Sequence, residues 1–405
     1  MFSTYFEVPT YLALSQFFVQ DFAIIMIVAA IVLLVTYKLK QPMVIGYILV
    51  GIIIGPHTPP FSYITDLETI NAIAELGIIM LLFVIGTEFP IAKLRSVGKI
   101  SAIVAVSETL GTLVISFFVA QTLNFSYYDS LFIALAMSIT STVITIRVLQ
   151  ELNMVNDQST TLLLGISIVE DILAITILGI LQSVAIQDIG GGGEVNILTI
   201  AVSLVIVGLF IGGILIFGSG YITPLIDKIG KTNNFALFLL SILGLGFGLS
   251  VSAQLLGLST ATGVFLAGVL VAESKHASLA RVITVPLRDL FAAGFFISVG
   301  MLMEISAIGS FIVPALLLII TSFVSKLFIV TGILIKAKYN NITALRTELG
   351  MSMAKGELSL VVVKTGYDSG IIASFLLPLV GVVTMITTFI TPYVIKFGKQ
   401  LGKTY

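Results

Sequence analysis

The sequence lacks cysteine and has few charged residues, and both absences narrow what the chain can be. It is 405 residues long, with no Cys and only 10% Asp, Glu, Lys and Arg. Without Cys there are no disulfides and no thiolate metal sites. An ordinary soluble domain carries about 25% charged residues, whereas 58% of this chain is hydrophobic. A water-soluble fold cannot bury that much apolar surface, so the composition predicts an integral membrane protein.

Other signals are missing as well. Two His residues in the whole chain make no cluster for a transition metal, and no G-x-x-x-x-G-K-[ST] phosphate loop is present. The first Lys or Arg is Lys38, so the first hydrophobic segment has no basic secretory-signal region before it and is expected to be retained. The formal net charge of −1 is uninformative. We expect a transport protein with no enzyme activity, no resident cofactor and no nucleic-acid partner.

Apolar runs long enough to cross a bilayer as helices recur along the whole chain. A hydrocarbon core of about 30 Å needs about 20 apolar residues per helix. We therefore expect an all-α membrane protein with about thirteen transmembrane helices, near residues 15–37, 41–56, 70–90, 98–122, 129–150, 158–186, 195–219, 233–253, 256–272, 283–305, 307–338, 344–367 and 370–395.

Basic residues fall into alternate connections between these helices. One side carries Lys38, Lys40, Lys93, Arg95, Lys99, Arg147, Lys228, Lys231, Lys275, Arg281, Arg288, Lys336, Lys338, Arg346, Lys396, Lys399 and Lys403. The opposite connections, 57–69, 122–129, 187–194, 253–256 and 304–307, contain no Lys or Arg. The positive-inside rule then predicts a multi-pass protein of the cell membrane with its N-terminus outside and its C-terminus cytoplasmic.

The sequence also contains an internal repeat. A shift of about 214–217 residues aligns 46–51 with 263–268, 82–86 with 296–300, and the polar stretch 138–145 with 352–359. This shift spans seven expected helices, an odd number, so the copies have opposite orientations in the membrane, as in many transporters. We expect one transmembrane domain over 1–405, with repeats at about 15–186 and 233–395, a linker helix at about 195–219 and no cytoplasmic nucleotide-binding domain.

Several charged residues lie in the middle of expected spans. They are Glu108, Glu170, Asp171, Lys326, Lys355 and Glu357. Each costs about 2.5–3.5 kcal/mol at mid-membrane, so each is expected to face a partner or a watery cavity. We interpret Glu170 and Asp171 as functional and Lys326 as their counter-ion. The alternative for Glu108 is a hydrogen bond to Ser or Thr neighbours in the bundle.

Hydroxyl groups accompany these charges. Ser167 and Asp171 are four residues apart and share a helical face, and the stretch 138–145 includes Thr140, Ser141 and Thr142. Together with 352–359 it is a candidate for a broken helix, whose free carbonyls can hold a cation. The alternative is that these hydroxyls bond to carbonyls of their own helix.

Oxygen ligands of this kind suit a hard monovalent cation. Burial in a low-dielectric cavity favours the neutral form of a carboxylic acid, which can then hold either a proton or a metal ion near neutral pH. We therefore predict that Asp171 transiently binds Na⁺ or K⁺ in competition with H⁺, and that the chain exchanges the two. The rival interpretations are a ligand-gated, Kef-like potassium efflux channel and a cation-coupled symporter of organic solutes.

At these residues the chain resembles the monovalent cation:proton antiporter-2 family, which includes Kef-type potassium efflux systems and sodium/proton antiporters. The similarity rests on 42–56, 138–145, 168–173 (IVEDIL), 262–274 (TGVFLAGVLVAES), 295–301 (FFISVGM) and 356–359. It implies a homodimer in the lipid membrane, with a dimerisation domain and a core domain that carries two crossed, broken helices and moves as an elevator.

The resemblance also implies residue roles. Asp171 would be the essential carboxylate, with Glu170 beside it, and Lys326 would pair with a carboxylate when the cation is absent. Thr140, Ser141 and Thr142 would lie at the first helix crossing, with Lys355 and Glu357 near the second.

The chain departs from the family at two points. Kef-type members typically have Gln-Asp, and the electrogenic sodium antiporters Asp-Asp, where this chain has Glu170 and Asp171. Both ion and stoichiometry stay open, although two acids and a buried lysine favour more than one proton per cation. Many Kef-type proteins also continue into a cytoplasmic nucleotide-binding domain after the last helix.

Overall fold

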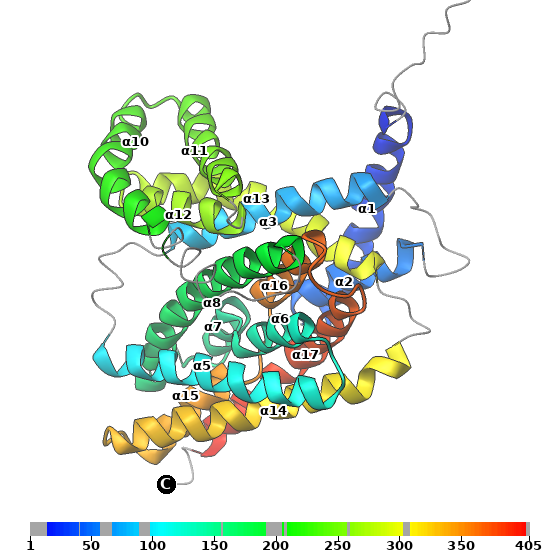
Figure 1. Ribbon diagram of the computed structural model, residues 1–405, viewed down its shortest axis with the longest axis vertical. Coiled ribbons are helices and arrows are strands. Elements are labelled where there is room, and N and C mark those ends of the chain that lie inside the picture. The colour runs from blue at the N-terminus through cyan, green and yellow to red at the C-terminus, as the bar shows by residue number, and fades with distance from the viewer. Residues whose placement is uncertain are drawn as a thin grey trace, which may run out of the picture.

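The computed structural model describes residues 14–39, 41–56, 67–88, 98–154, 157–191, 205, 209–256, 260–302 and 308–401. Every secondary-structure element in these ranges is a helix (Figure 1). The helices are α1 (Leu14–Lys38), α2 (Met43–Ile54), α3 (Leu67–Thr87), α5 (Lys99–Thr122), α6 (Tyr127–Ser138), α7 (Thr142–Glu151), α8 (Gln158–Gly191), η2 (Ile214–Ile222), α10 (Thr223–Gly230), α11 (Phe235–Leu255), α12 (Thr260–Ala272), α13 (Ala277–Met301), α14 (Ile308–Lys336), α15 (Asn341–Met351), α16 (Glu357–Asp368) and α17 (Leu376–Leu401).

The expected membrane-protein class is confirmed. Eight of the described helices are long and apolar enough to cross a bilayer, and three shorter apolar helices accompany them. Two expected spans, 129–150 and 344–367, are each divided into two helices, α6 with α7 and α15 with α16. Both interruptions fall on the polar stretches 138–145 and 352–359, which were the candidates for helix breaks.

One expected boundary is wrong. The linker helix was expected to end near 219, but a π-helical segment, η2, leads directly into α10, which continues to Gly230. A proline lies in the first turn of α10, where its missing N–H breaks no hydrogen bond of that helix. Lys40, Lys93, Arg95, Lys403, much of the linker and most of the connections 57–69, 187–194 and 304–307 lie outside the described residues.

The helices form two neighbouring bundles (Figure 1). The first contains α1, α2, α3 and η2 to α13, and the second contains α5 to α8 and α14 to α17. The bundles meet where α8 packs against α12 and where α17 packs against α2 and α13. Both interrupted helix pairs belong to the second bundle, so all polar groups of the breaks are held in one unit.

Two close helix crossings organise the first bundle. A Cβ atom added to Gly51 of α2 would lie 2.8 Å from the Cα of Gly300 in α13. A Cβ added to Gly86 of α3 would lie 2.9 Å from the Cα of Gly268 in α12. Only glycine lets two membrane helices approach so closely.

These crossings are exchanged by the sequence repeat. The alignment of 46–51 with 263–268 pairs Gly51 with Gly268, and the alignment of 82–86 with 296–300 pairs Gly86 with Gly300. Swapping the two repeats therefore converts one crossing into the other. We propose that a pseudo-two-fold axis relates the repeats at this point, as in inverted-repeat transporters.

We expect Gly268→Val to destabilise the protein by about 1–3 kcal/mol, because the larger side chain forces α3 and α12 apart. Thermal unfolding in detergent measures the effect. Gly244→Val on α11 is the matched control, since an added Cβ at Gly244 has no heavy atom within 4 Å among the described residues. Equal unfolding temperatures for the two variants would show that the crossing is not closely packed.

Candidate functional site

The two hydroxyl-rich stretches are both interrupted in the structure. α6 ends at Ser138 and α7 begins at Thr142, whereas α15 ends at Met351 and α16 begins at Glu357. At the first break Ile139 is extended, with φ −84° and ψ 143°. Its carbonyl therefore leaves the helical hydrogen-bond pattern and becomes available to other donors.

The two breaks cross and touch. The Ser141 amide donates to the Ala354 carbonyl at 2.7 Å, and Thr140 Oγ1 donates to the Met351 carbonyl at 2.5 Å. Gly356 lies so close to Ser141 that an added Cβ would overlap its side chain. The interrupted pairs are thus two crossed discontinuous helices, as the sequence predicted.

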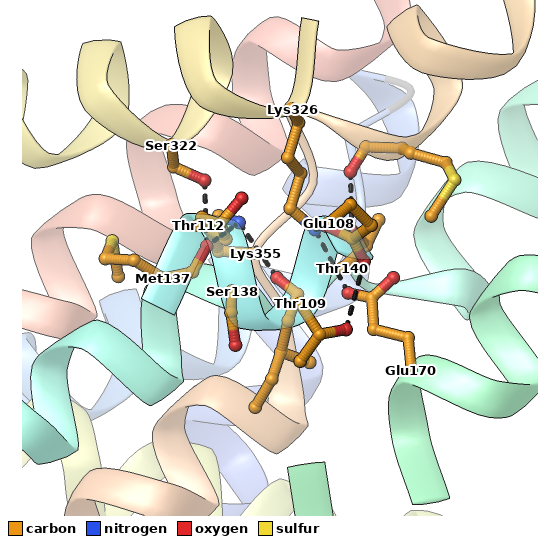
Figure 2. Close-up of polar contacts among 12 residues, drawn as sticks. Glu108, Thr109, Thr112, Met137, Ser138, Thr140, Glu170, Ser322, Lys326 and Lys355 are labelled. Carbon is orange, nitrogen blue, oxygen red and sulfur yellow. Dashed lines mark hydrogen bonds and ion pairs between the residues drawn. The ribbon is translucent and has the colours of Figure 1, made fainter. Parts of the chain in front are cut away.

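Lys355, at the second break, binds the end of α6. Its Nζ donates to the carbonyls of Met137 at 2.6 Å and Ile139 at 2.9 Å, and the residue is 1% exposed (Figure 2). The C-terminal end of a helix carries unpaired carbonyls and partial negative charge. Among the described residues Lys355 has no carboxylate at ion-pair distance, so the helix end itself compensates the buried ammonium group.

Lys326 on α14 lies close to three oxygen atoms, one on α8, one on α5 and one at the first break. Its Nζ lies 3.1 Å from Glu170 Oε1 on α8, 3.2 Å from Glu108 Oε2 on α5 and 2.8 Å from Thr140 Oγ1 at the first break (Figure 2). Lys326 and both glutamates are 0% exposed. This ion-pair cluster of Lys326, Glu108 and Glu170 has two acids for one base.

A cavity of about 150 Å³ lies beside the crossing. Its walls come from the end of α3, both breaks, α7 and α8: Ile85, Glu88, Ile139, Thr140, Ser141, Thr142, Ile146, Leu164, Ile168, Asp171, Gly356, Glu357 and Leu358. A space of this size holds several water molecules. It therefore offers a cation both protein oxygens and part of its hydration shell.

Asp171 is the α8 carboxylate in this cavity. It is partly exposed, unlike its buried neighbour Glu170, and within the described part of the chain it has no ion-pair or hydrogen-bond partner. Glu88, exposed at the end of α3, lines the same cavity. The cavity thus reaches Asp171 from the side on which α3 ends.

Most of the predicted site residues come together, in two adjoining groups. Asp171, Thr140, Ser141, Thr142 and Glu357 line the cavity. Glu170, Lys326 and Glu108 form the ion-pair cluster next to it, and Thr140 belongs to both groups. Glu357 also accepts a long hydrogen bond, 3.4 Å, from Ser141 Oγ.

Ser167 is placed differently. Its Oγ is buried and has no hydrogen-bond partner among the described residues, and it is not one of the residues that line the cavity. Residues four apart on a helix are rotated by about 40° from each other. Leu164 and Ile168, which line the cavity with Asp171, lie on one side of it around the helix, whereas Ser167 is rotated to the other side.

Sequence reasoning missed three features of the site. Neither Glu88 nor Glu348 on α15 was among the predicted site residues. Glu348 is fully buried, with both carboxyl oxygens unpartnered in the described part of the chain. Buried hydroxyls also extend the polar region: Ser325 donates to Thr112 at 3.1 Å. The signal for these buried hydroxyls is the row of polar residues along the inward face of α5.

Comparisons with known proteins identify transporters that are similar to this chain. The chain is 32% identical over 287 residues to the putative cation/proton antiporter YbaL of Escherichia coli, covering 69% of this chain and 50% of YbaL. It is 24% identical to the K⁺/H⁺ antiporter subunit KhtU of Bacillus subtilis, covering 93% and 92% of the two chains. The chain thus spans only half the length of YbaL but nearly all of KhtU.

A solved structure shows the same fold. The sodium proton antiporter MjNhaP1 of Methanocaldococcus jannaschii superposes with a TM-score of 0.71 at 18% identity, covering 95% of this chain and 97% of MjNhaP1. The family described as sodium/hydrogen exchanger, transmembrane, matches residues 24–397. Because this match covers nearly the whole chain, the protein belongs to the sodium/hydrogen exchanger transmembrane family.

Proposed function

We propose that this protein exchanges a monovalent cation, Na⁺ or K⁺, for protons across the membrane, and that Asp171 binds either the cation or the proton. The observation that carries the proposal is the placement of Asp171. It has no ion-pair or hydrogen-bond partner among the described residues, and it lines a cavity of about 150 Å³ at the crossing of two broken helices. Its neighbour Glu170 is already paired with Lys326.

The ligands around Asp171 fit a hard cation. Thr140, Ser141 and Thr142 bring hydroxyl and carbonyl oxygens to the same cavity, and Glu357 adds a second carboxylate. Oxygen ligands of this type suit alkali ions better than transition metals. Because Asp171 has one carboxylate, a bound proton and a bound cation exclude each other, and this competition couples the two fluxes.

The direction of opening fits an alternating-access cycle. The cavity extends toward Glu88, and the connection that follows contains Lys93, Arg95 and Lys99. By the positive-inside rule that side is cytoplasmic, so we assign the structure to an inward-open state. In the proposed cycle the second bundle moves as an elevator against the first, which forms a homodimer in the plasma membrane.

The channel interpretation is less consistent with the site. A pore needs a continuous filter of carbonyls or a ring of charge, whereas Asp171 closes a cavity beside a buried ion-pair cluster. The symporter interpretation needs a binding region for an organic solute. The cavity walls hold mainly Ile, Leu and hydroxyl residues and no aromatic group among the described lining residues.

The test is cation-induced proton movement in liposomes. We expect purified protein, reconstituted with an internal pH dye, to alkalinise or acidify the lumen when Na⁺, K⁺ or Li⁺ is added on one side. Comparison of the three ions gives the selectivity that the sequence leaves open. The name of KhtU, a K⁺/H⁺ antiporter subunit, makes K⁺ the first ion to examine.

N-methylglucamine chloride and protein-free liposomes control for leaks and ionic strength. If none of the three alkali ions changes the internal pH, the antiport proposal is wrong. Ion flux that continues without any proton movement would favour the channel instead.

A further inference from the structure

The two bundles touch closely where α8 passes α12. A Cβ atom added to Gly179 of α8 would lie 2.8 Å from Thr262 Oγ1 of α12. α8 belongs to the second bundle and α12 to the first (Figure 1). The Gly179–Thr262 contact therefore joins the bundle that carries both helix breaks to the bundle that packs beside it.

This contact lies on the outer side of Asp171. Gly179 follows Asp171 by eight residues, which is about 12 Å along a helix. The connection 187–194, at the end of α8, contains no Lys or Arg, so the positive-inside rule makes this end of the helix the outer one. The cavity extends the opposite way, toward Glu88. In this structure the Gly179–Thr262 contact thus lies between Asp171 and the outer side of the membrane.

Neighbouring residues close the same part of the boundary between the bundles. Ile180, next to Gly179 on α8, packs against the buried Ala253 at the end of α11. In the first bundle α12 is itself held against α3 by the close approach of Gly268 to Gly86. Because that crossing fixes α12, a separation at Gly179 requires α8 to move.

Two buried oxygen atoms near this contact have no hydrogen-bond partner in the described part of the chain, Thr262 Oγ1 and Gln182 Oε1. Gln182 lies three residues after Gly179 and shares its face of α8, and its amide nitrogen donates to Ser369 Oγ at 2.6 Å. A polar atom that is buried without a partner costs free energy, because it has lost its hydrogen bonds to water. Closure leaves both oxygens in that state, and opening would let water or a hydrated cation bind them.

We propose that Gly179 and Thr262 form the outer gate of the cation path to Asp171. When the gate opens, Thr262 Oγ1 and Gln182 Oε1 line the path and contact the hydrated cation. When it closes, the missing side chain of Gly179 lets the two helices meet with no space between them. This inference rests on the proposed antiport function, to which it adds the residues that separate the site from the outer side.

A disulfide across the gate provides the test, because the chain has no Cys and introduced cysteines are then its only thiols. In Gly179→Cys combined with Thr262→Cys, the new Cβ lies 2.8 Å from the position of the Thr262 oxygen, which the second sulfur replaces. This placement suits a disulfide, whose Cβ atoms are about 3.5–4.5 Å apart. Oxidation in proteoliposomes should reduce cation-dependent proton movement to the level of protein-free liposomes, and reduction should restore it.

Thr36→Cys combined with Gly46→Cys is the matched control. A Cβ added to Gly46 of α2 also lies 2.8 Å from a threonine oxygen, Thr36 Oγ1 of α1, but both helices belong to the first bundle. Oxidation should cross-link this pair and leave exchange unchanged. Loss of labelling by a maleimide measures how completely each disulfide forms. If the gate pair is fully cross-linked and exchange stays normal, the gate inference is wrong while the antiport proposal stands.

If the double variant does not fold or does not cross-link, Thr262→Cys alone replaces it. Thr262 is 3% exposed, so a membrane-impermeant maleimide added outside intact cells should react slowly at rest and faster when an ion gradient drives exchange. Ser250→Cys is the control, since Ser250 is 4% exposed and lies between α11 and α12 within the first bundle; it should stay protected in both conditions.

Equal protection of Thr262→Cys at rest and during exchange would overturn the gate inference. Failure of the antiport proposal gives a different result, because the unaltered protein would then show no pH change with any alkali ion, before any cysteine is introduced.

Discussion

Asp171→Asn is expected to abolish cation-dependent proton movement in proteoliposomes. The asparagine amide has no carboxyl proton to release and no negative charge, so it can hold neither the proton nor the cation. Losing about 3 kcal/mol of interaction with a charged ligand lowers its affinity about 100-fold. The expected exchange rate therefore falls at least about 100-fold at cation concentrations well below those that saturate the unaltered protein.

The same variant separates loss of binding from loss of folding. Asp171 has no described partner to lose, so the thermal unfolding temperature in detergent should not fall. In the unaltered protein Na⁺ or K⁺ should raise that temperature, because a ligand that binds only the folded state stabilises it, and Asp171→Asn should remove the increase. Asp289→Asn is the control, since Asp289 is 60% exposed and pairs with Arg288 on the surface. Normal exchange in Asp171→Asn would refute the site assignment.

Lys355→Met is expected to destabilise the protein by about 2–4 kcal/mol. Methionine has similar length and keeps the packing, but it has no donors. The Ile139 carbonyl then loses the ammonium donor at 2.9 Å, and the Met137 carbonyl keeps only the Ser322 hydroxyl. A buried carbonyl left without a partner costs about 1–3 kcal/mol, and the positive charge that stabilises the end of α6 is lost as well.

Thermal unfolding in detergent and the exchange assay measure the effect together. We expect exchange to fall along with stability, because Ile139 and Thr140 lie next to the cavity. Lys336→Met provides the matched control, since Lys336 is exposed at the end of α14. If both methionine variants unfold at the same temperature, Lys355 does not hold the first break in place.

Local sequence features predicted most of the helices. Hydrophobic length identified α5, α8 and α14 to within a few residues. A cluster of Ser and Thr marked the first break, and the repeat alignment marked the polar stretch 352–359 as its counterpart. The linker helix was expected to end near 219, whereas the helical structure continues through η2 and α10 to Gly230. Hydropathy also averages over the interrupted spans, so it showed each as one helix.

Buried charge was equally visible in the sequence. Glu170, Asp171 and Lys326 stand out because they are charged residues in the middle of apolar spans, and their high cost in lipid made them site candidates. The sequence did not identify the partners of these charges correctly. Sequence reasoning paired Lys326 with the Glu170–Asp171 dipeptide as a whole, whereas the structure pairs it with Glu170 and Glu108 and leaves Asp171 to the cavity.

The sequence by itself determined that this is a membrane protein of apolar helices, where charges lie within its spans and which two stretches are candidates for helix breaks, because each of these depends on the composition of a single segment. Only the tertiary structure decided that Glu108 contacts Lys326, that Lys355 binds the end of α6, and that Asp171 faces the cavity while Ser167 does not. Those contacts depend on the rotation and tilt of neighbouring helices, and these are set by close packing across the bundle rather than by the spacing of residues along one helix.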